Sequence, residues 1–269
     1  MGMAVRIPED SAPCEGEDRF TVELTFHGDL GYFLGRQERS QPASPPPAVV
    51  LRVLNRKTSV KDVIEACGVP HPEVDLILIG GDPVGFSAQL RTSAQVGVFP
   101  VSVAGPFPWA RLQARNVQTF LADGHLGKLV RDLRLLGIDV SYSHDVEDRE
   151  LVATMVRENR ALLTRDRPLL MHRVVSSGYC PRSQVPLEQT VEVIRRFDLR
   201  QKLAPFNRCL RCNGLLAVTP KQVVVDRLEP LTRLYYDEFQ QCSRCAQTYW
   251  RGSHLAKLEK RVETVLARL

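Results

Sequence analysis

The chain has 269 residues, which is enough for two domains with hydrophobic cores of ordinary size. It contains no apolar run approaching the ~20 residues that a membrane-spanning helix needs, and residues 1–20 are too acidic and too poor in apolar side chains for a signal peptide. We therefore expect a cytoplasmic protein with reduced cysteines and no membrane association.

The charge differs between the two parts of the chain. Residues 1–109 contain 9 basic and 13 acidic residues, whereas the remainder contains 27 and 18, so the two parts carry −4 and +9. A basic surface attracts polyanions, which favours a polyanionic partner for the second part. The alternative is that arginine-rich helices are merely well solvated.

Residues 19–104 predict a first domain, and the acidic, aperiodic residues 1–18 before it predict a disordered tail. Four strands and one short helix are predicted, the strands at Phe20–Phe26, Val49–Leu54, Val74–Ile79 and Val96–Val103 and the helix at Ser59–Cys67. Their order and the size of the domain predict a β-grasp, or ubiquitin-like, layout. Residues 105–117 then predict a linker, which Pro106 and Pro108 stiffen and Trp109 anchors to a surface.

Residues 118–205 predict an α/β domain. Thr119–Ala122, Asp139–Ser141 and Ala161–Leu163 have the length and composition of strands. Between them, apolar residues at helical spacing predict two helices, with Leu126, Leu129, Val130 and Leu133 on the first and Leu151, Val152, Met155 and Val156 on the second. Strands that alternate with helices predict a parallel sheet covered on both faces.

Three aspartates fall where such a sheet binds ligands. Asp123 and Asp166 follow strands, and ligands bind beyond the carboxyl ends of the strands, while Asp148 begins the second helix and approaches from the side. Neighbouring carboxylates repel one another unless a cation or protons join them, and Mg²⁺ or Mn²⁺ suits oxygen ligands. Such a metal activates water for phosphodiester hydrolysis. The alternative is that Asp148 is a helix N-cap and the other two are loop aspartates.

The segments F-L-A-D-x-x-L-G-K-L, L-R-L-L-G-I-D, D-x-E-L and L-L-T-R-D-R resemble the Mut-seven C-terminal (Mut7-C) ribonuclease domain, a branch of the PIN-like nucleases, over residues 118–269. The resemblance implies a PIN-like fold with metal-binding Asp123, Asp148 and Asp166. Arg165 and Arg167 flank the last of these and are candidates for holding a phosphate. A fourth acid is common in such sites, with Asp145 and Glu150 as candidates, and His125 departs from the family pattern.

Residues 59–81 resemble the ubiquitin-like domain often fused ahead of this nuclease family. Relatives that carry sulfur end in an exposed Gly-Gly, whereas Gly80-Gly81 is internal and predicts a turn. The chain continues past the last strand, which argues against covalent carrier chemistry. We expect the domain to dock a protein partner or to position RNA.

Residues 206–269 contain the strongest local motif of the sequence. Cys209-x2-Cys212 and Cys242-x2-Cys245 supply four thiolates, which predicts a closed, structural zinc site in a zinc ribbon, and reducing conditions disfavour the disulfide alternative. The 29 residues between the pairs predict a long hairpin over Val223–Tyr236. A C-terminal helix follows, with an apolar stripe at Leu255, Leu258, Val262, Val265 and Leu266.

The segment Tyr249–His254 resembles the family's Y-W-x-G-S-H signature. Tyr249 and Trp250 are candidates for stacking on an unpaired base, with ordinary packing as the alternative. His254 is either a packed structural residue or a ligand of the acidic site or a phosphate.

These patterns predict a metal-dependent ribonuclease that acts on RNA with one or two Mg²⁺ or Mn²⁺ ions, with a structural Zn²⁺ beside them. The main alternative is a non-catalytic RNA- or ribosome-binding adaptor with a degenerate PIN-like domain. A toxin of a toxin–antitoxin pair is disfavoured, because such toxins are usually small single domains.

Overall fold

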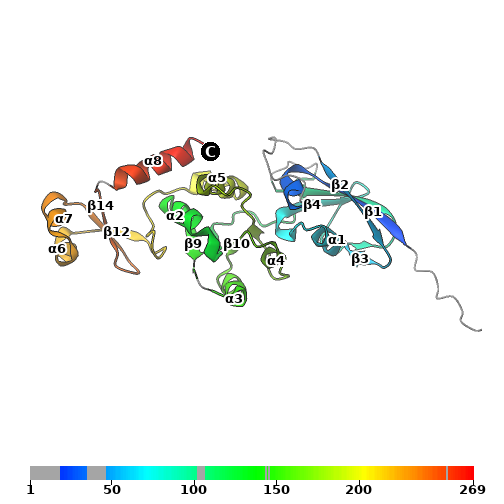
Figure 1. Cartoon of the computed structure of the whole chain (residues 1–269), viewed down its shortest axis with the longest axis horizontal. Helices are drawn as coiled ribbons and strands as arrows, with labels where there is room; N and C mark the ends of the chain where they lie inside the picture. The colour runs from blue at the N-terminus through cyan, green and yellow to red at the C-terminus, as the bar shows by residue number, and fades with distance from the viewer. Residues whose placement is uncertain (1–18, 35–46, 102–106, 143, 145, 253) are drawn as a thin grey trace, which may run out of the picture.

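The computed structural model describes residues 19–34, 47–101, 107–142, 144, 146–252 and 254–269. The predicted tail, residues 1–18, and Asp145 lie outside this part. Three units follow one another along the molecule: an N-terminal sheet domain, a central domain with a parallel sheet, and a C-terminal ribbon with the long last helix (Figure 1). None of the helices within the described ranges is long and apolar enough to cross a membrane.

The N-terminal unit is a β-grasp domain, as predicted. Its main sheet has the order β2-β1-β7-β4-β5, in which β1 pairs antiparallel with β2 and parallel with β7. The strands are β1 (Phe20–Phe26), β2 (Ala48–Leu54), β4 (Val74–Ile79), β5 (Asp82–Val84) and β7 (Ala94–Pro100), with a small sheet of β3 (Thr58–Ser59) and β6 (Gln89–Leu90).

Helix α1 (Val60–Ala66) begins where the Ser59 hydroxyl accepts a hydrogen bond from the Asp62 backbone N–H (3.1 Å). Its buried side chains share one core with the inward-facing residues of β1. The predicted turn at Gly80-Gly81 joins β4 to β5, and both glycines have positive φ, which favours glycine there.

The central unit has a four-stranded parallel sheet in the order β11-β10-β8-β9, which confirms the predicted fold class. Its strands are β8 (Thr119–Ala122), β9 (Asp139–Tyr142), β10 (Ala161–Leu163) and β11 (Gly178–Tyr179). Its helices are α2 (Gly127–Leu135), α3 (Asp148–Glu158), α4 (Arg167–Leu170) and α5 (Pro186–Arg196). Helix α2 packs its buried leucines against the sheet and α5, and the chain leaves it through Gly137 at φ 87°.

The strand order creates a topological switch point, the kind of place where open α/β sheets bind ligands. From β8 the chain passes to β9 on one side, whereas from β10 it passes to β11 on the other side. Strands β8 and β10 are neighbours, so their outgoing connections diverge, and the carboxyl ends of these two strands form a topological switch point.

The C-terminal unit differs from the prediction between its cysteine pairs. Strands β12 (Leu216–Thr219), β13 (Phe239–Cys242) and β14 (Thr248–Trp250) form an antiparallel ribbon. The expected long hairpin over Val223–Tyr236 is wrong, because α6 (Lys221–Val224) and α7 (Pro230–Tyr235) fill that segment. Pro230 stands at the first turn of α7, where proline favours a helix and cannot serve a strand ladder.

The last helix ties the ribbon to the central unit. Helix α8 (Leu255–Leu266) buries Val262 and Val265 in the same core as α2 and α5. Arg261 forms an ion pair with Asp132 of α2. Two members of the predicted apolar stripe are therefore core residues of the neighbouring unit, while Leu266 is exposed.

The first two units are packed together. The Arg182 side chain is 10% exposed and contacts Glu73 (2.8 Å) and Asp29 (3.0 Å), and the His71 ring lies 2.7 Å from the Val175 carbonyl oxygen. The segment that connects the two units packs against the N-terminal domain, where the backbone N–H of Leu112 donates a hydrogen bond to the Asp75 carbonyl. Trp109 does not anchor it as expected, since this residue is 77% exposed.

Candidate catalytic and metal-binding sites

Thr164 joins the ends of β8 and β10 at the switch point. Its hydroxyl donates to Asp123 Oδ2 (2.8 Å) and accepts a hydrogen bond from the backbone N–H of Asp166 (2.9 Å). Thr164 is fully buried, so its two hydrogen bonds are protected from competing water. The two strand-end aspartates are therefore held to one another through one side chain.

Asp166 has one engaged carboxylate oxygen. Oδ1 accepts from the backbone N–H of Leu169 (3.0 Å) and so caps α4. Within the described chain, Oδ2 of Asp166 has no hydrogen-bond partner, and the residue is exposed. An oxygen of this kind remains available to a cation.

Asp123 is held in its ionised form. Its Oδ1 lies 3.1 Å from the His125 backbone N and 3.0 Å from the ring Nδ1. Burial raises the pKa of Asp123, but hydrogen bonds from the His125 backbone, the Thr164 hydroxyl and the His125 ring outweigh it, so the pKa lies below its usual value. The His125 side chain is 92% exposed, so Asp123 is held from its solvent-facing side.

Asp148 is the first residue of α3 and is exposed. The N-cap is Glu147, so Asp148 is not the cap that the alternative interpretation proposed. The loop before α3 runs against the loop of Asp123: a Cβ on Gly124 would lie 2.6 Å from the His144 carbonyl oxygen, and the Tyr142 hydroxyl donates to the Gly124 carbonyl (2.8 Å). In the described ranges, however, the three aspartates are not gathered within the 4.8 Å that groups the four cysteines.

The two flanking arginines have different partners. Arg165 donates to the Gln184 side chain (2.6 Å), a neutral group. Arg167 instead reaches the ubiquitin-like domain, where Nη1 donates to the Phe33 carbonyl (2.9 Å) and the guanidinium lies 5.2 Å from the centroids of the Tyr32 and Phe33 rings.

The four predicted zinc ligands come together. Cys209, Cys212, Cys242 and Cys245 place their sulfur atoms within 4.8 Å of one another. The distances Cys209 Sγ–Cys245 Sγ (3.6 Å) and Cys212 Sγ–Cys242 Sγ (3.4 Å) are near the ~3.8 Å that tetrahedral Zn–S bonds of about 2.3 Å imply. The donor set therefore fits zinc.

Close packing shapes the two cysteine knuckles. A Cβ on Gly214 would lie 2.7 Å from Cys242 Sγ, so the site requires glycine there. Burial raises the pKa of Cys209, but the Tyr249 hydroxyl, backbone N–H groups and Cys245 lower it to about 7. A thiolate is thus accessible near neutral pH.

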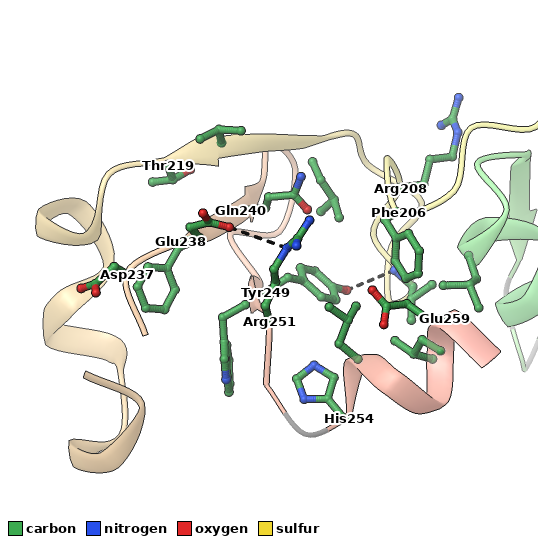
Figure 2. A pocket seen from close by; sticks show the side chains of 18 of the residues that line it. Phe206, Arg208, Thr219, Asp237, Glu238, Gln240, Tyr249, Arg251, His254 and Glu259 are labelled. Carbon is green, nitrogen blue, oxygen red and sulfur yellow. Dashed lines mark hydrogen bonds and ion pairs between the residues drawn. The ribbon is translucent and has the colours of Figure 1, made fainter. Parts of the chain in front are cut away.

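An aromatic pocket of about 730 Å³ lies between the ribbon, α8 and Phe206 (Figure 2). Tyr249 and Trp250 come from β14, and His254 faces Trp250 edge-on with ring centroids 5.6 Å apart. The Tyr249 hydroxyl lies 3.1 Å from Cys209 Sγ and accepts a hydrogen bond from the Leu210 backbone N–H (3.1 Å), so Tyr249 supports the cysteine site. Trp250 and His254 both line this pocket.

Sequence reasoning missed Thr164. Its signal was a hydroxyl residue between a buried strand and Asp166 in L-L-T-R-D-R. Assigning its role required knowing that β10 lies beside β8.

The comparisons with known proteins identify two domains. A family model described as the Mut7-C RNAse domain matches residues 118–262, more than half of the chain. A second model, described as Mut7-C ubiquitin, matches residues 19–105. No curated protein and no solved structure matches the chain.

Proposed function

The chain belongs to the family of the Mut7-C RNAse domain, preceded by that family's ubiquitin-like domain, and from this premise we propose that it is a metal-dependent ribonuclease. The observation that carries the proposal is the pairing of Asp123 and Asp166 through Thr164 at the switch point of a parallel sheet. The net charge of +9 on residues 110–269 suits an RNA substrate. We place the protein in the cytoplasm, where thiolates remain reduced.

Asp123, Asp166 and Asp148 would hold Mg²⁺ or Mn²⁺. Hard cations take carboxylate oxygens, and the ionised Asp123 with the unengaged Oδ2 of Asp166 fits that preference. A bound metal of this kind neutralises charge on the phosphate and activates water. Asp148 would join from the start of α3, which follows the loop that lies against Gly124.

The other residues of the site orient the aspartates and the substrate. Thr164 fixes the Asp123 carboxylate, and the His125 ring holds its second oxygen. Arg165 exchanges its neutral partner Gln184 for a phosphate oxygen, which is a stronger acceptor. We assign Arg167 to the domain interface, since its donors already serve backbone carbonyls.

The C-terminal unit would bind RNA away from the aspartates at the ends of β8 and β10. Four cysteines close the coordination shell of a structural Zn²⁺, which leaves no open position for catalysis. Trp250, partly exposed in the aromatic pocket, offers a ring on which an unpaired base stacks.

The test is cleavage of mixed cellular RNA by purified protein with Mn²⁺, compared with Asp166→Asn. Zinc content and melting temperature are measured for both, so that a misfolded variant is not mistaken for an inactive one. We expect cleavage by the wild type alone. Equal cleavage by Asp166→Asn would remove this residue from the site.

A second candidate function is a non-catalytic RNA-binding adaptor. It is favoured by one observation: in the described part of the chain, the three aspartates do not lie within 4.8 Å of one another. RNA binding without cleavage by the wild type in the same experiment would select the adaptor.

A further inference from the structure

Strand β2 has an open edge with an apolar row beside it. It ends the sheet order β2-β1-β7-β4-β5, and in the described residues its backbone pairs with β1 alone. Val49, Leu51 and Val53 alternate along its outer face and are 45%, 64% and 67% exposed. An exposed edge with alternating aliphatic side chains is a template for another strand.

A hollow lies along the other face of the same strand. It measures about 470 Å³ and is lined by Phe33, Leu34, Val50 and Cys67 and by Arg52 and Arg167, with Val49 at its rim where the strand begins. Val50 packs partly against the domain core, so this is the inner face of β2. The hollow therefore borders both the strand edge and the residue that follows Asp166.

The two arginines that line the hollow donate to neutral acceptors within the described part of the chain. Arg52 donates to the Ala66 carbonyl (3.1 Å) and the Cys67 sulfur (3.4 Å), and Arg167 donates to the Phe33 carbonyl (2.9 Å). All of these acceptors are neutral. No carboxylate in the described ranges lies within ion-pair distance of either guanidinium, so the hollow is complementary to an anionic side chain.

We propose that the β2 edge binds an extended acidic segment of a partner protein, which adds to the sheet as a further strand. Successive side chains of a strand point to opposite faces. An alternating segment therefore places apolar residues beside Val49, Leu51 and Val53 and acidic residues beside Arg52 and Arg167. Main-chain hydrogen bonds to the open edge supply affinity, and the two faces supply specificity.

A peptide fits these features better than RNA does. An RNA phosphate would form ion pairs with the two arginines. It would leave the backbone edge unpaired and the aliphatic row uncovered, however. The strand partner satisfies all three features. This inference is independent of whether the nuclease domain cleaves RNA.

The test measures binding of a fluorescein-labelled peptide of alternating valine and glutamate to the full chain by fluorescence anisotropy. We expect saturable binding, which Arg52→Gln weakens by roughly tenfold or more because a charge-assisted hydrogen bond is lost. Arg56→Gln is the matched control: Arg56 is exposed just after β2 and does not line the hollow, so its variant should bind like the wild type. Melting temperatures verify that both variants fold.

Two further probes test the mode of binding without altering the protein. The same peptide with alternate backbone amides N-methylated should lose binding, because it cannot donate to the edge. A valine–lysine peptide should also fail. Binding of either probe as tight as the original, no binding of the original, or its displacement by polyuridylate in an Arg52-dependent manner would overturn the proposal, the last by assigning the arginines to RNA.

Discussion

Thr164 is the residue on which the two strand-end aspartates depend. Replacing it with valine keeps the shape but leaves the Asp123 oxygen without its donor and the Asp166 N–H without its acceptor. We expect Thr164→Val to lower the free energy of unfolding by about 1–3 kcal/mol and cleavage by roughly 10- to 100-fold. Urea unfolding and single-turnover cleavage measure the two effects.

Thr164→Ser is the control, because it keeps the hydroxyl. It should retain most of the activity. A valine variant as active as the wild type would show that the bridge does not orient the aspartates.

At the scale of elements, Asp139 at the start of β9 fastens the ribbon to the central sheet. Its carboxylate contacts Arg160 (2.5 Å), Arg208 (3.2 Å) and the Asn213 amide (2.9 Å). Burial raises the pKa of Asp139, but its partners, Arg160 foremost, bring it below 3.8. The ionised carboxylate therefore stabilises the fold above that pH, and the stabilisation is lost as pH falls through the folded-state pKa.

Asp139→Asn should consequently be less stable than the wild type at neutral pH, with a deficit that shrinks below about pH 4. Urea unfolding of both proteins across this range measures the difference. A deficit that stays constant to the lowest pH would mean that the carboxylate's charge is not what matters.

The cysteine knuckles support elements beyond the ribbon. Since α8 follows the ribbon and buries Val262 and Val265 in the central core, removing zinc should unfold the C-terminal unit and also lower the stability of the central domain. We expect a chelator to lower the helical circular dichroism signal and the melting temperature, and zinc to restore both. Unchanged melting after verified metal loss would contradict a structural site.

At the scale of the whole molecule, the interface between the first two domains contains a buried ion pair. Arg182 is enclosed by Glu73 and Asp29 and by the Phe33 and Tyr179 rings. Arg182→Ala leaves Glu73, which is 2% exposed, without its cation. The substitution should therefore lower the free energy of unfolding by about 3–5 kcal/mol. Adding Glu73→Gln should recover part of the loss, as a double-mutant cycle by urea unfolding would show. If the two substitutions changed the free energy of unfolding by fully additive amounts, Arg182 and Glu73 would not be coupled.

The sequence was informative wherever a signal was local. Alternation predicted β1, the apolar spacing predicted α2, and the Cys-x2-Cys pairs predicted the cysteine cluster. What it did not show depends on contacts between distant residues. Glu73 and Arg182 are 109 positions apart, and the partner of Arg167 lies on another domain. The helices between β12 and β13 were missed because cysteine spacing limits the length of the insert and not its conformation.

The measurement that tests the account most directly is Mn²⁺ binding by electron paramagnetic resonance, in which bound Mn²⁺ is lost from the signal of the free ion. We expect the wild type to bind Mn²⁺ and both Asp123→Asn and Asp166→Asn to lose that binding. Asp226→Asn, at an exposed position in the insert between β12 and β13, should bind like the wild type. If Asp123→Asn and Asp166→Asn both bound Mn²⁺ as the wild type does, a metal site at the ends of β8 and β10 would be contradicted.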